Sequence, residues 1–296
     1  MTMAQSRIKI PTLNLQLVAD AIAIEEEAAK EAGMIGYMAR AMVQATMPTK
    51  DPKTTHFERK NGFITLTMVA MNKDIGLPFG GIPRLVMAWI GREVVRTREQ
   101  KIPLGSSLSD FLKELDLYRA GGPRGDITRL RKQMTRLFSA AITANYSNSD
   151  CTAIKNTLIA EEADLWWNTK EIHQAGLWES TVTIGSGLYK ELLESPVPVD
   201  IRALKALKNN SMALDIYNWR TYRNKYLRKS TLIPWEGLRM QFGGDYKETK
   251  HFKPDFLKNL RKVQTVYPES RQDITDRGLV IIPSRPHVIP VNNPVN

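Results

Sequence analysis

Residues 107–142 read SLSDFLKELDLYRAGGPRGDITRLRKQMTRLFSAAI, and this stretch decides the predicted fold. Its first part, Ser107–Leu115, is amphipathic and opens with the S-x-x-D pattern that caps many helices. Residues 120–125 hold three glycines and a proline, which interrupt the helix. A longer helix is then predicted over residues 127–142, with Asp126 as its N-cap. A short helix, a turn and a longer helix form the unit with which many proteins place side chains in the major groove of DNA.

The longer helix is predicted to have an apolar face and a basic face. Its apolar residues recur at helical spacing and are Ile127, Leu130, Met134, Leu137, Phe138 and Ala141. Arg129, Lys132 and Arg136 lie on the opposite face, whereas Arg131 lies nearer the apolar edge and would have to extend outward from it. A solvated helix face usually mixes both signs of charge, but residues 124–137 hold five basic residues and one acidic residue. This excess favours an anionic partner.

The same pattern occurs a second time, within residues 234–267. Pro234 suits the first position of a short helix, which a pair of glycines ends. Pro254 is predicted to open the long helix. The buried stripe of that helix is predicted to comprise Phe252, Phe256, Leu260, Val263 and Tyr267. Residues 278–282 are rich in β-branched side chains and are predicted to form a strand, as the wing of a winged-helix domain requires.

Eight basic side chains are predicted to contact DNA. The first unit contributes Arg129, Lys132 and Arg136, and the second contributes Lys253, Lys258, Arg261 and Lys262. Arg223 is added because it lies in residues 211–229, a predicted helix in which basic and aromatic residues alternate. Cations in such a helix can meet phosphate while rings stack on bases, but we interpret its aromatic rings as core residues.

The fold class predicted from these patterns is α+β, mainly α, with two winged-helix domains in tandem. The predicted segments are an N-terminal helical extension and linker (residues 1–55), a first winged-helix domain (56–184), a second winged-helix domain (185–285) and a flexible tail (286–296). The extension is predicted to be helical over residues 13–47 and is acidic around Glu25–Glu27, so we expect it to contact protein rather than DNA. Residues 48–60 are rich in Pro, Thr and Lys and are interpreted as a linker.

Further elements are predicted within the two domains. The first is expected to hold a strand over residues 61–70, a helix over 82–98, and strands over 152–160 and 181–184. The adjacent Trp166 and Trp167 are interpreted as buried core residues rather than as platforms for bases. The second is expected to hold a helix over 187–194, a helix from the N-cap Asp200 to about Lys208, and the basic and aromatic helix already described.

The chain has 296 residues, a formal net charge of +11 and a pI near 9.6. Its 42% of hydrophobic and 25% of charged residues are ordinary for a globular protein, so the basic excess is the unusual feature. It indicates nucleic acid, rather than a membrane, as the partner. No apolar run approaches the roughly 18 residues needed to span a bilayer, and the first residues do not show the apolar stretch that is typical of a signal peptide. Cys151 is the single cysteine, so we expect no internal disulfide and a cytoplasmic location.

The sequence shows no motif of catalysis or cofactor binding. It has no P-loop pattern and no G-x-G-x-x-G pattern after a strand. His56, His173, His251 and His287 are far apart and form no metal-binding pair. Adjacent glutamates such as residues 25–27 are interpreted as solvated. We therefore predict no enzymatic activity, no cofactor and no metal ion.

Motifs spread over residues 33–288 resemble the plasmid-encoded RepA family of replication initiators. The resemblance is carried by stretches that include GYMARAMVQATMP (36–48), GIPRLVMAWI (81–90), GGPRGDITRLRKQMTRLF (121–138) and FKPDFLKNLRK (252–262). It implies a bacterial protein that binds repeated sequences (iterons) at a plasmid origin, helps to melt adjacent AT-rich DNA, and recruits the host initiator and helicase. It also implies tandem winged helices and a switch between a homodimer that limits copy number and a monomer that initiates.

Other classes of protein remain as alternatives. A plasmid or phage transcription repressor is the strongest, because it would share the basic helices without the host contacts. A nuclease or relaxase would need a cluster of carboxylates, or of His and Tyr side chains. An RNA-binding protein would not need the paired units.

If a homodimer forms, we expect it to use the strand over residues 62–70 and the helix that contains Trp89. Deletion of residues 1–47 is expected to spare binding to a single iteron.

Overall fold

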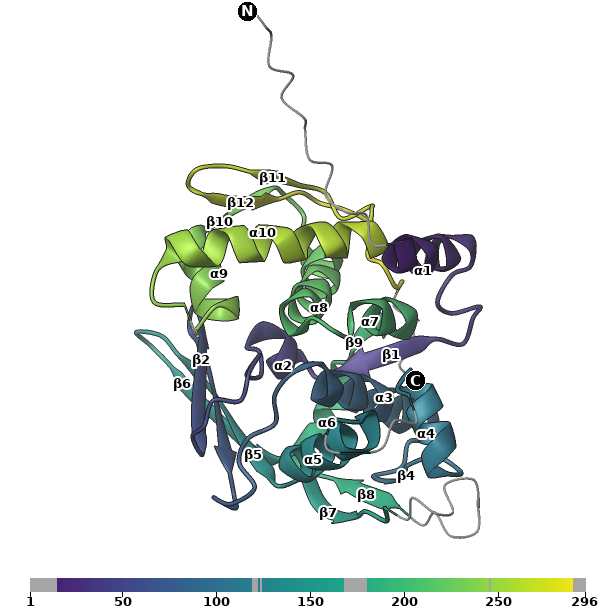
Figure 1. The fold of residues 1–296 in the computed structure, drawn as a ribbon. Helices are drawn as coiled ribbons and strands as arrows, with labels where there is room; N and C mark the ends of the chain where they lie inside the picture. Colours follow the sequence, from purple (N-terminus) through teal and green to yellow (C-terminus); the bar gives the residue numbers. More distant parts are fainter. Residues whose placement is uncertain (1–14, 119–121, 123, 168–179, 245, 290–296) are drawn as a thin grey trace, which may run out of the picture.

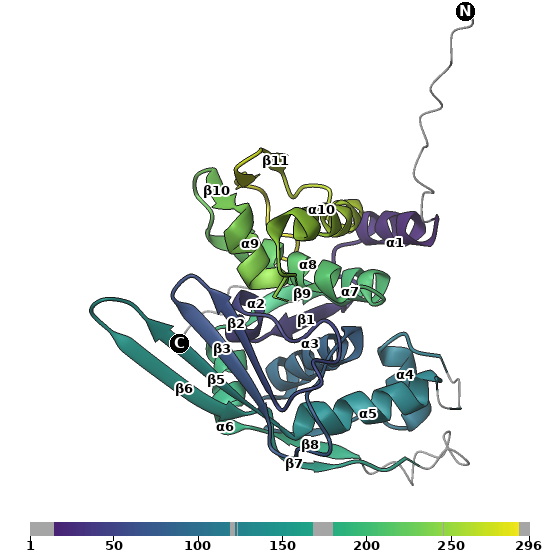
Figure 2. The same cartoon turned by 60° about the vertical axis from the view of Figure 1, so that its left-hand side comes forward.

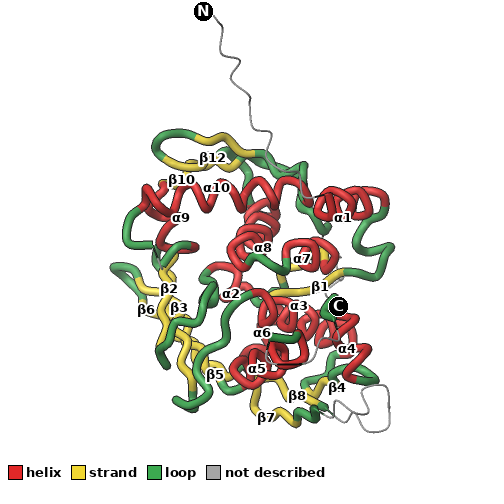
Figure 3. The backbone as a smooth tube through the Cα atoms, viewed as in Figure 1, coloured by secondary structure: helices red, strands yellow, loops and turns green. Residues whose placement is uncertain are grey.

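Helices occupy the middle of the structure, and a three-stranded sheet lies at each end (Figures 1 and 3). The computed structural model describes residues 15–118, 122, 124–167, 180–244 and 246–289. A four-stranded sheet projects from one side of this arrangement (Figure 2). The class is therefore mixed α and β, and the strand content is larger than the sequence patterns predict.

The elements have the following bounds. The helices are α1 (Leu15–Glu26), α2 (Arg40–Gln44), α3 (Gly81–Thr97), α4 (Leu108–Glu114), α5 (Asp126–Phe138), α6 (Ser186–Glu194), α7 (Ile201–Leu207), α8 (Ser211–Tyr226), α9 (Trp235–Phe242) and α10 (Thr249–Val266). The strands are β1 (Ile35–Met38), β2 (His56–Asn61), β3 (Ile64–Ala70), β4 (Lys101–Pro103), β5 (Ala140–Ser147), β6 (Thr152–Leu158), β7 (Ala160–Asp164), β8 (Thr181–Ile184), β9 (Val197–Asp200), β10 (Thr231–Pro234), β11 (Gln272–Ile274) and β12 (Gly278–Ile281).

One order of elements occurs twice. The first unit runs α3, β4, α4, α5, β7, β8, and its sheet has the order β4-β8-β7. The second unit runs α8, β10, α9, α10, β11, β12, and its sheet has the order β10-β12-β11. In both sheets the last strand therefore lies between the other two. The repetition that the sequence shows in two helices extends over a helix, a strand, two helices and two strands.

The projecting sheet combines β2 and β3, which precede α3, with β5 and β6, which interrupt the first unit between α5 and β7. Its order is β2-β3-β5-β6, with every neighbouring pair antiparallel. The predicted strand over residues 61–70 is confirmed as β3, which begins at Ile64. This strand is central, paired on both sides, so the prediction that it offers a free edge for a partner is wrong. Residues 48–60 are not only a linker, because residues 56–60 belong to β2.

The N-terminal segment is tied to the middle of the chain. Residues 35–38, which were expected to be helical, form β1 and pair antiparallel with β9. Gly91 of α3 allows this strand to lie close, since a Cβ there would sit 2.0 Å from the Tyr37 carbonyl oxygen. α1 packs against α7 and α10. The guanidinium of Arg202 donates to the carbonyls of Ala23 and Glu27 at the end of α1, at 3.2 and 2.8 Å.

A buried ion pair joins the first helices of the two units. Arg84 of α3 and Asp215 of α8 make two contacts of 2.7 Å and are almost fully buried. Burial raises the pKa of Asp215, and the charge and hydrogen bonds of Arg84 act in the opposite direction. Arg84 also donates to the carbonyls of Met47 and Gly80, at 2.7 and 2.6 Å. Three parts of the chain, namely the loop at Met47, the start of α3 and α8, therefore meet at one guanidinium.

Both long basic helices begin at other residues than predicted, and α5 also ends earlier than predicted. α5 has Gly125, not Asp126, at its N-cap, and it stops at Phe138 because residues from Ala140 onward pair with β3. α10 begins at Thr249, so Pro254 lies inside the helix instead of opening it. Pro254 lacks the N–H that would bond the carbonyl four residues earlier, and Lys250 is exposed there, so solvent can take that bond.

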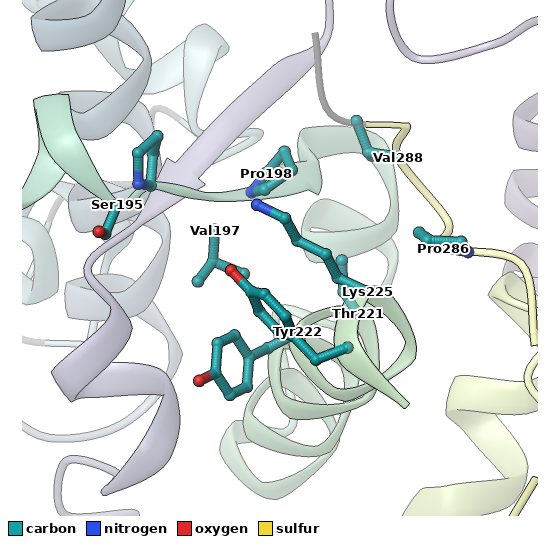
Figure 4. Close-up of a pocket in the computed structure, with 10 residues that line it drawn as sticks. Ser195, Val197, Pro198, Thr221, Tyr222, Lys225, Pro286 and Val288 are labelled. Atoms are coloured by element: carbon teal, nitrogen blue, oxygen red, sulfur yellow. The ribbon is translucent and has the colours of Figure 1, made fainter. Parts of the chain in front are cut away.

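The C-terminal residues 286–289 pack against the second unit and do not form a flexible tail; residues 290–296 lie outside the described part of the chain. Val288 is buried, and Nδ1 of His287 lies 2.6 Å from the Tyr217 hydroxyl. Pro286 and Val288 line a pocket with Thr221, Tyr222 and Lys225 of α8 (Figure 4). Its volume is about 10 Å³, which leaves room for at most one water molecule.

Two further predictions concern the adjacent tryptophans and membrane-spanning helices. Trp167 packs partly buried against the core, but Trp166 is 58% exposed, so the prediction of two buried tryptophans is only half right. No helix in the described ranges is long and apolar enough to cross a bilayer.

Candidate nucleic-acid interface

α10 is held by an aromatic cluster beneath it. The predicted buried stripe is confirmed, since Phe252, Phe256, Leu260, Val263 and Tyr267 are all buried. Phe256 packs against Trp235 and Phe242 of α9, with ring centroids 6.2 and 5.6 Å apart. Large, rigid rings on both helices fix their relative position at little cost in side-chain entropy. The opposite face of α10 is consequently turned outward.

The turn between α9 and α10 is fixed by a polar network. Arg239 pairs with Glu236 and donates to the Tyr246 carbonyl at 2.7 Å. Thr249, the first residue of α10, donates to Glu236 at 2.6 Å. The hydrogen bonds from Arg239 and then Thr249 lower the pKa of Glu236 to about 2. Glu236 therefore stays ionised at neutral pH and anchors the start of α10.

The outward face of α10 carries most of the basic residues predicted for the second unit. Lys258 and Arg261 are exposed and Lys262 is half-buried. Among the described residues, none of these three forms an ion pair with a carboxylate, so their charges are available to an outside anion. Lys253 differs, because its ammonium lies over the Trp235 ring at 4.8 Å and is half-buried.

α5 occupies the corresponding place in the first unit, below α3 in Figure 2. Leu130, Met134 and Leu137 face the core with no exposed surface. Gln133 is also buried, and its side-chain oxygen accepts the N–H of Phe79 at 2.9 Å. Lys132 is exposed as predicted. The helix thus presents its outer side to solvent in the same way as α10 does.

Two predicted side chains of α5 have partners within the protein. Arg129 is exposed but pairs with Asp126 at 2.8 Å. Arg136 was expected on the basic face, but it pairs with Asp51 at 3.1 Å and donates to the Leu77 carbonyl at 3.0 Å. Its side chain is only 11% exposed. Arg136 therefore holds neighbouring loops onto α5, and the structure places it apart from the outward side chains.

Arg223 lies on α8, away from both basic helices in sequence and half-buried in the structure. Its neighbour Arg220, another basic residue of the same helix, is fully buried and donates to the Ser270 hydroxyl at 2.7 Å. Burial lowers the pKa of Arg220 to about 10. The interpretation of the helix as a core element is confirmed for Tyr217 and Trp219, which are buried.

Three exposed cations were not among the predicted DNA contacts. Arg131 of α5 is exposed although it lies nearer the apolar stripe, and Arg124 is exposed just before the helix. In the second unit, Arg277 is exposed in the turn between β11 and β12. Arg124 belongs to the basic excess that the sequence does show, and Arg277 lies beside the predicted strand, so charge counting extended to the flanks would have found both.

The described ranges contain no group of three or more His, Cys, Asp or Glu side chains placed to hold a metal ion. The expectations of no metal, no cofactor and no catalysis remain predictions.

A family model described as plasmid-encoded RepA protein matches residues 77–236 of this chain. The matched span begins before α3 and ends in the first turn of α9, and it includes α5. This chain belongs to the family of plasmid-encoded RepA proteins, a plasmid replication family. The resemblance inferred from the sequence motifs is confirmed.

Two solved structures are similar to this chain. A crystal structure of domains 2 and 3 of RctB, with selenomethionine, has a TM-score of 0.51 at 10% identity and covers 80% of this chain and 95% of that chain. Another structure of RctB domains 2–3 has a TM-score of 0.42 at 14% identity and covers 81% of this chain and 94% of that chain. The first likeness concerns the fold alone. No curated protein matches this sequence.

Proposed function

We propose that this chain initiates plasmid replication by binding repeated origin sequences (iterons) with two winged-helix domains in tandem. The observation that carries the proposal is the repeated order of a helix, a strand, two helices and two strands, with the last strand in the middle of each sheet. A winged-helix domain has this order, and its third helix enters the major groove. α5 and α10 are the third helices of the two units. Membership in a plasmid replication family supports the same proposal.

The proposed domain limits stay at residues 56–184 and 185–285, with residues 1–55 as an N-terminal addition. The β5–β6 hairpin is an insertion into the first domain, and the β2–β3 hairpin, which pairs with it, precedes the first helix of that domain. The β11–β12 hairpin would be the wing of the second domain. This division is supported by the separate sheets of the two units.

The proposed DNA contacts follow the outward cations. Lys258, Arg261 and Lys262 of α10 are the main contacts in the second domain. In the first domain Lys132 and Arg129 are joined by Arg131, which takes the place of Arg136. Arg or Lys side chains on a helix in the major groove commonly pair with guanine, and the remaining cations would neutralise phosphates.

The protein is proposed to act by binding and not by catalysis, in the bacterial cytoplasm and without a cofactor. After binding its iterons it would help to melt the adjacent DNA and recruit the host initiator and helicase. A homodimer is also proposed. β6 is an outer strand of the projecting sheet and carries the exposed Ile154, so this strand is the edge at which a second copy would pair.

The proposal is tested by asking whether a plasmid origin fragment replicates only when this chain is supplied in trans. We expect replication with the intact chain and none without it. Specific binding to the origin repeats without support of replication would instead indicate a transcription repressor, the alternative that shares the same DNA-binding units.

The base-reading role of α10 is tested with Arg261→Ala on a duplex that holds one iteron and on a scrambled duplex. We expect a loss of about 1–3 kcal/mol on the iteron and a smaller loss on the scrambled duplex. Lys190→Ala removes an exposed charge from α6 and serves as the control. Equal weakening on both duplexes would make Arg261 a phosphate contact.

A further inference from the structure

A short loop after α2, residues 47–51, is fastened to α3 and α5. The Met47 carbonyl accepts a hydrogen bond from Arg84 of α3, at 2.7 Å. The Pro48 carbonyl accepts the N–H of Gly80 at 3.2 Å, next to the first residue of α3. Asp51 pairs with Arg136 of α5 at 3.1 Å. Such anchoring holds the loop in one conformation, so side chains that project from it are positioned in advance.

The same loop forms one wall of a polar groove beside the second unit. The groove has a volume of about 430 Å³. Thr49 and Lys50 line it from the loop, residues 209–212 line it from the start of α8, and Lys258 lines it from α10. The Ser211 hydroxyl and the Thr49 carbonyl, 3.5 Å apart, connect two of these walls. The groove therefore lies between the loop, α8 and α10.

Two cations line this groove. Lys50 and Lys258 are both exposed, and neither forms an ion pair with any carboxylate in the described part of the chain. The groove also contains Asp255, whose carboxylate accepts the Tyr246 hydroxyl at 2.7 Å. Two ammonium groups that share a groove repel one another, and an anion bound between them removes that repulsion. Asn209 adds a neutral hydrogen-bond donor to the lining.

The position of the groove identifies the anion. Through Asp51 the loop reaches α5, and through Lys50 it reaches the groove beside α10, so it lies between the two helices proposed to enter the major groove. A single duplex bound by both helices has to carry its phosphate backbone past this point. We propose that the groove binds a backbone phosphate of duplex DNA between the contacts of α5 and α10, with Lys50 and Lys258 as its cations. This inference rests on the proposed function.

The experiment measures the salt dependence of binding for Lys50→Gln on one-iteron and scrambled duplexes. Lys50 is exposed, so the variant should keep the thermal unfolding midpoint of the parent protein. Loss of one phosphate contact should reduce the slope of log affinity against log salt by about 0.9 and weaken binding roughly five- to tenfold at 0.1 M salt. The loss should be equal on both duplexes, because a phosphate carries no base identity. Lys190→Gln, which removes one charge from α6, is the matched control and should leave the slope unchanged.

Ethylation of single phosphates places the contact. We expect interference at a phosphate between the two sets of base contacts for the parent protein and none there for Lys50→Gln. If Lys50→Gln keeps the parent's affinity and slope while Arg261→Ala loses iteron binding, the phosphate groove is refuted and the proposed function stands. A loss confined to the iteron would also refute it, because Lys50 would then contact a base. If the parent does not prefer the iteron, the proposed function fails, and the scrambled duplex alone still decides whether Lys50 contributes a phosphate contact.

Discussion

The guanidinium of Arg84 joins three parts of this fold. It reaches Asp215 on α8 and carbonyls at the ends of two loops while it remains buried. A buried charge that loses its partner costs far more than an exposed one, because the remaining charge keeps its desolvation penalty. The stability of the junction between the units therefore depends on both members of the pair.

We predict that Arg84→Met lowers the free energy of unfolding by about 3–5 kcal/mol, because it leaves Asp215 unpaired in the core. Urea denaturation of the parent and the variant measures this. The double variant Arg84→Met, Asp215→Leu should recover much of the loss, since no charge is then left buried. An unchanged denaturation midpoint in the single variant would contradict this account.

Arg131 and Arg136 show why single side chains were hard to place from the sequence. The spacing along α5 puts Arg136 well away from the apolar stripe, yet residues 72–79 and Asp51 cover that end of the helix. Arg131 has no such cover and is exposed beside the stripe. Periodicity predicts which side of a helix meets the core, but it holds no information about loops that fold over the other side.

For α5, these positions predict different outcomes for two sets of substitutions. Arg131→Ala with Lys132→Ala should leave the unfolding midpoint nearly unchanged and reduce the salt slope of DNA binding by up to about 1.8, if each contacts a phosphate. Arg136→Ala should instead lower stability, because Asp51 keeps only Lys53 as a cationic partner and the Leu77 carbonyl loses its donor. Urea denaturation and salt titration of both variants separate the two effects. Unchanged affinity in the double variant would show that α5 only faces solvent.

Helices with a continuous apolar stripe were predictable, and strands that pair over long distances were not. α3, α4, α7 and α8 lie close to their predicted positions because each combines periodic apolar residues with a capping or breaking residue. β1 was missed because its four residues pair with β9, far along the chain, and nothing local distinguishes them from a helix. For the candidate interface, the sequence predicts the two basic helices correctly. It does not predict which of their cations are free of partners within the protein.

The N-terminal residues contribute to the core over part of their length, which changes the expected result of truncation. Leu17 and Ile24 of α1 are buried against the second unit, while Met38 and Val43 belong to the central core. Deletion of residues 1–26 should preserve the fold at a cost of roughly 3–6 kcal/mol, the value of two buried aliphatic side chains.

Deletion of residues 1–47 removes β1 and α2 as well, and we predict that this variant does not fold. This corrects the expectation that such a deletion spares binding to a single iteron. Circular dichroism and thermal unfolding of the two truncated chains test the difference. A cooperative unfolding transition in the shorter chain would overturn the prediction.

Stability should also depend on pH through His287. Burial lowers the pKa of this imidazole from its ordinary value of 6.5, with opposing contributions from Asp200 and Glu269. The folded protein therefore keeps His287 neutral at a pH where the unfolded chain binds a proton. The stability is fully present above pH 6.5 and is lost as the pH falls below 6.5 towards the lowered pKa.

We predict that His287→Phe removes this part of the pH dependence. The slope attributable to one proton is at most about 1.4 kcal/mol per pH unit. Urea denaturation of the parent and the variant between pH 7.5 and 5.5 measures it. Phe retains a ring to pack against Tyr267, whose centroid lies 4.6 Å from that of His287. Equal slopes in the two proteins would exclude His287 as the titrating group.

The pairing of β1 with β9 has a consequence for synthesis of the chain on the ribosome. About 160 residues separate the two strands, so at about 5–20 residues per second β1 waits roughly 10–30 s for its partner to be made. α1 waits longer still, because it packs against α10. α3 can cover one side of β1 earlier, but the apolar side chains that meet α7, β9 and α10 stay uncovered until those elements are made. A nascent chain is therefore expected to need a chaperone over its first part, and chains released before residue 200 should be degraded rather than accumulate as a partial DNA-binding protein.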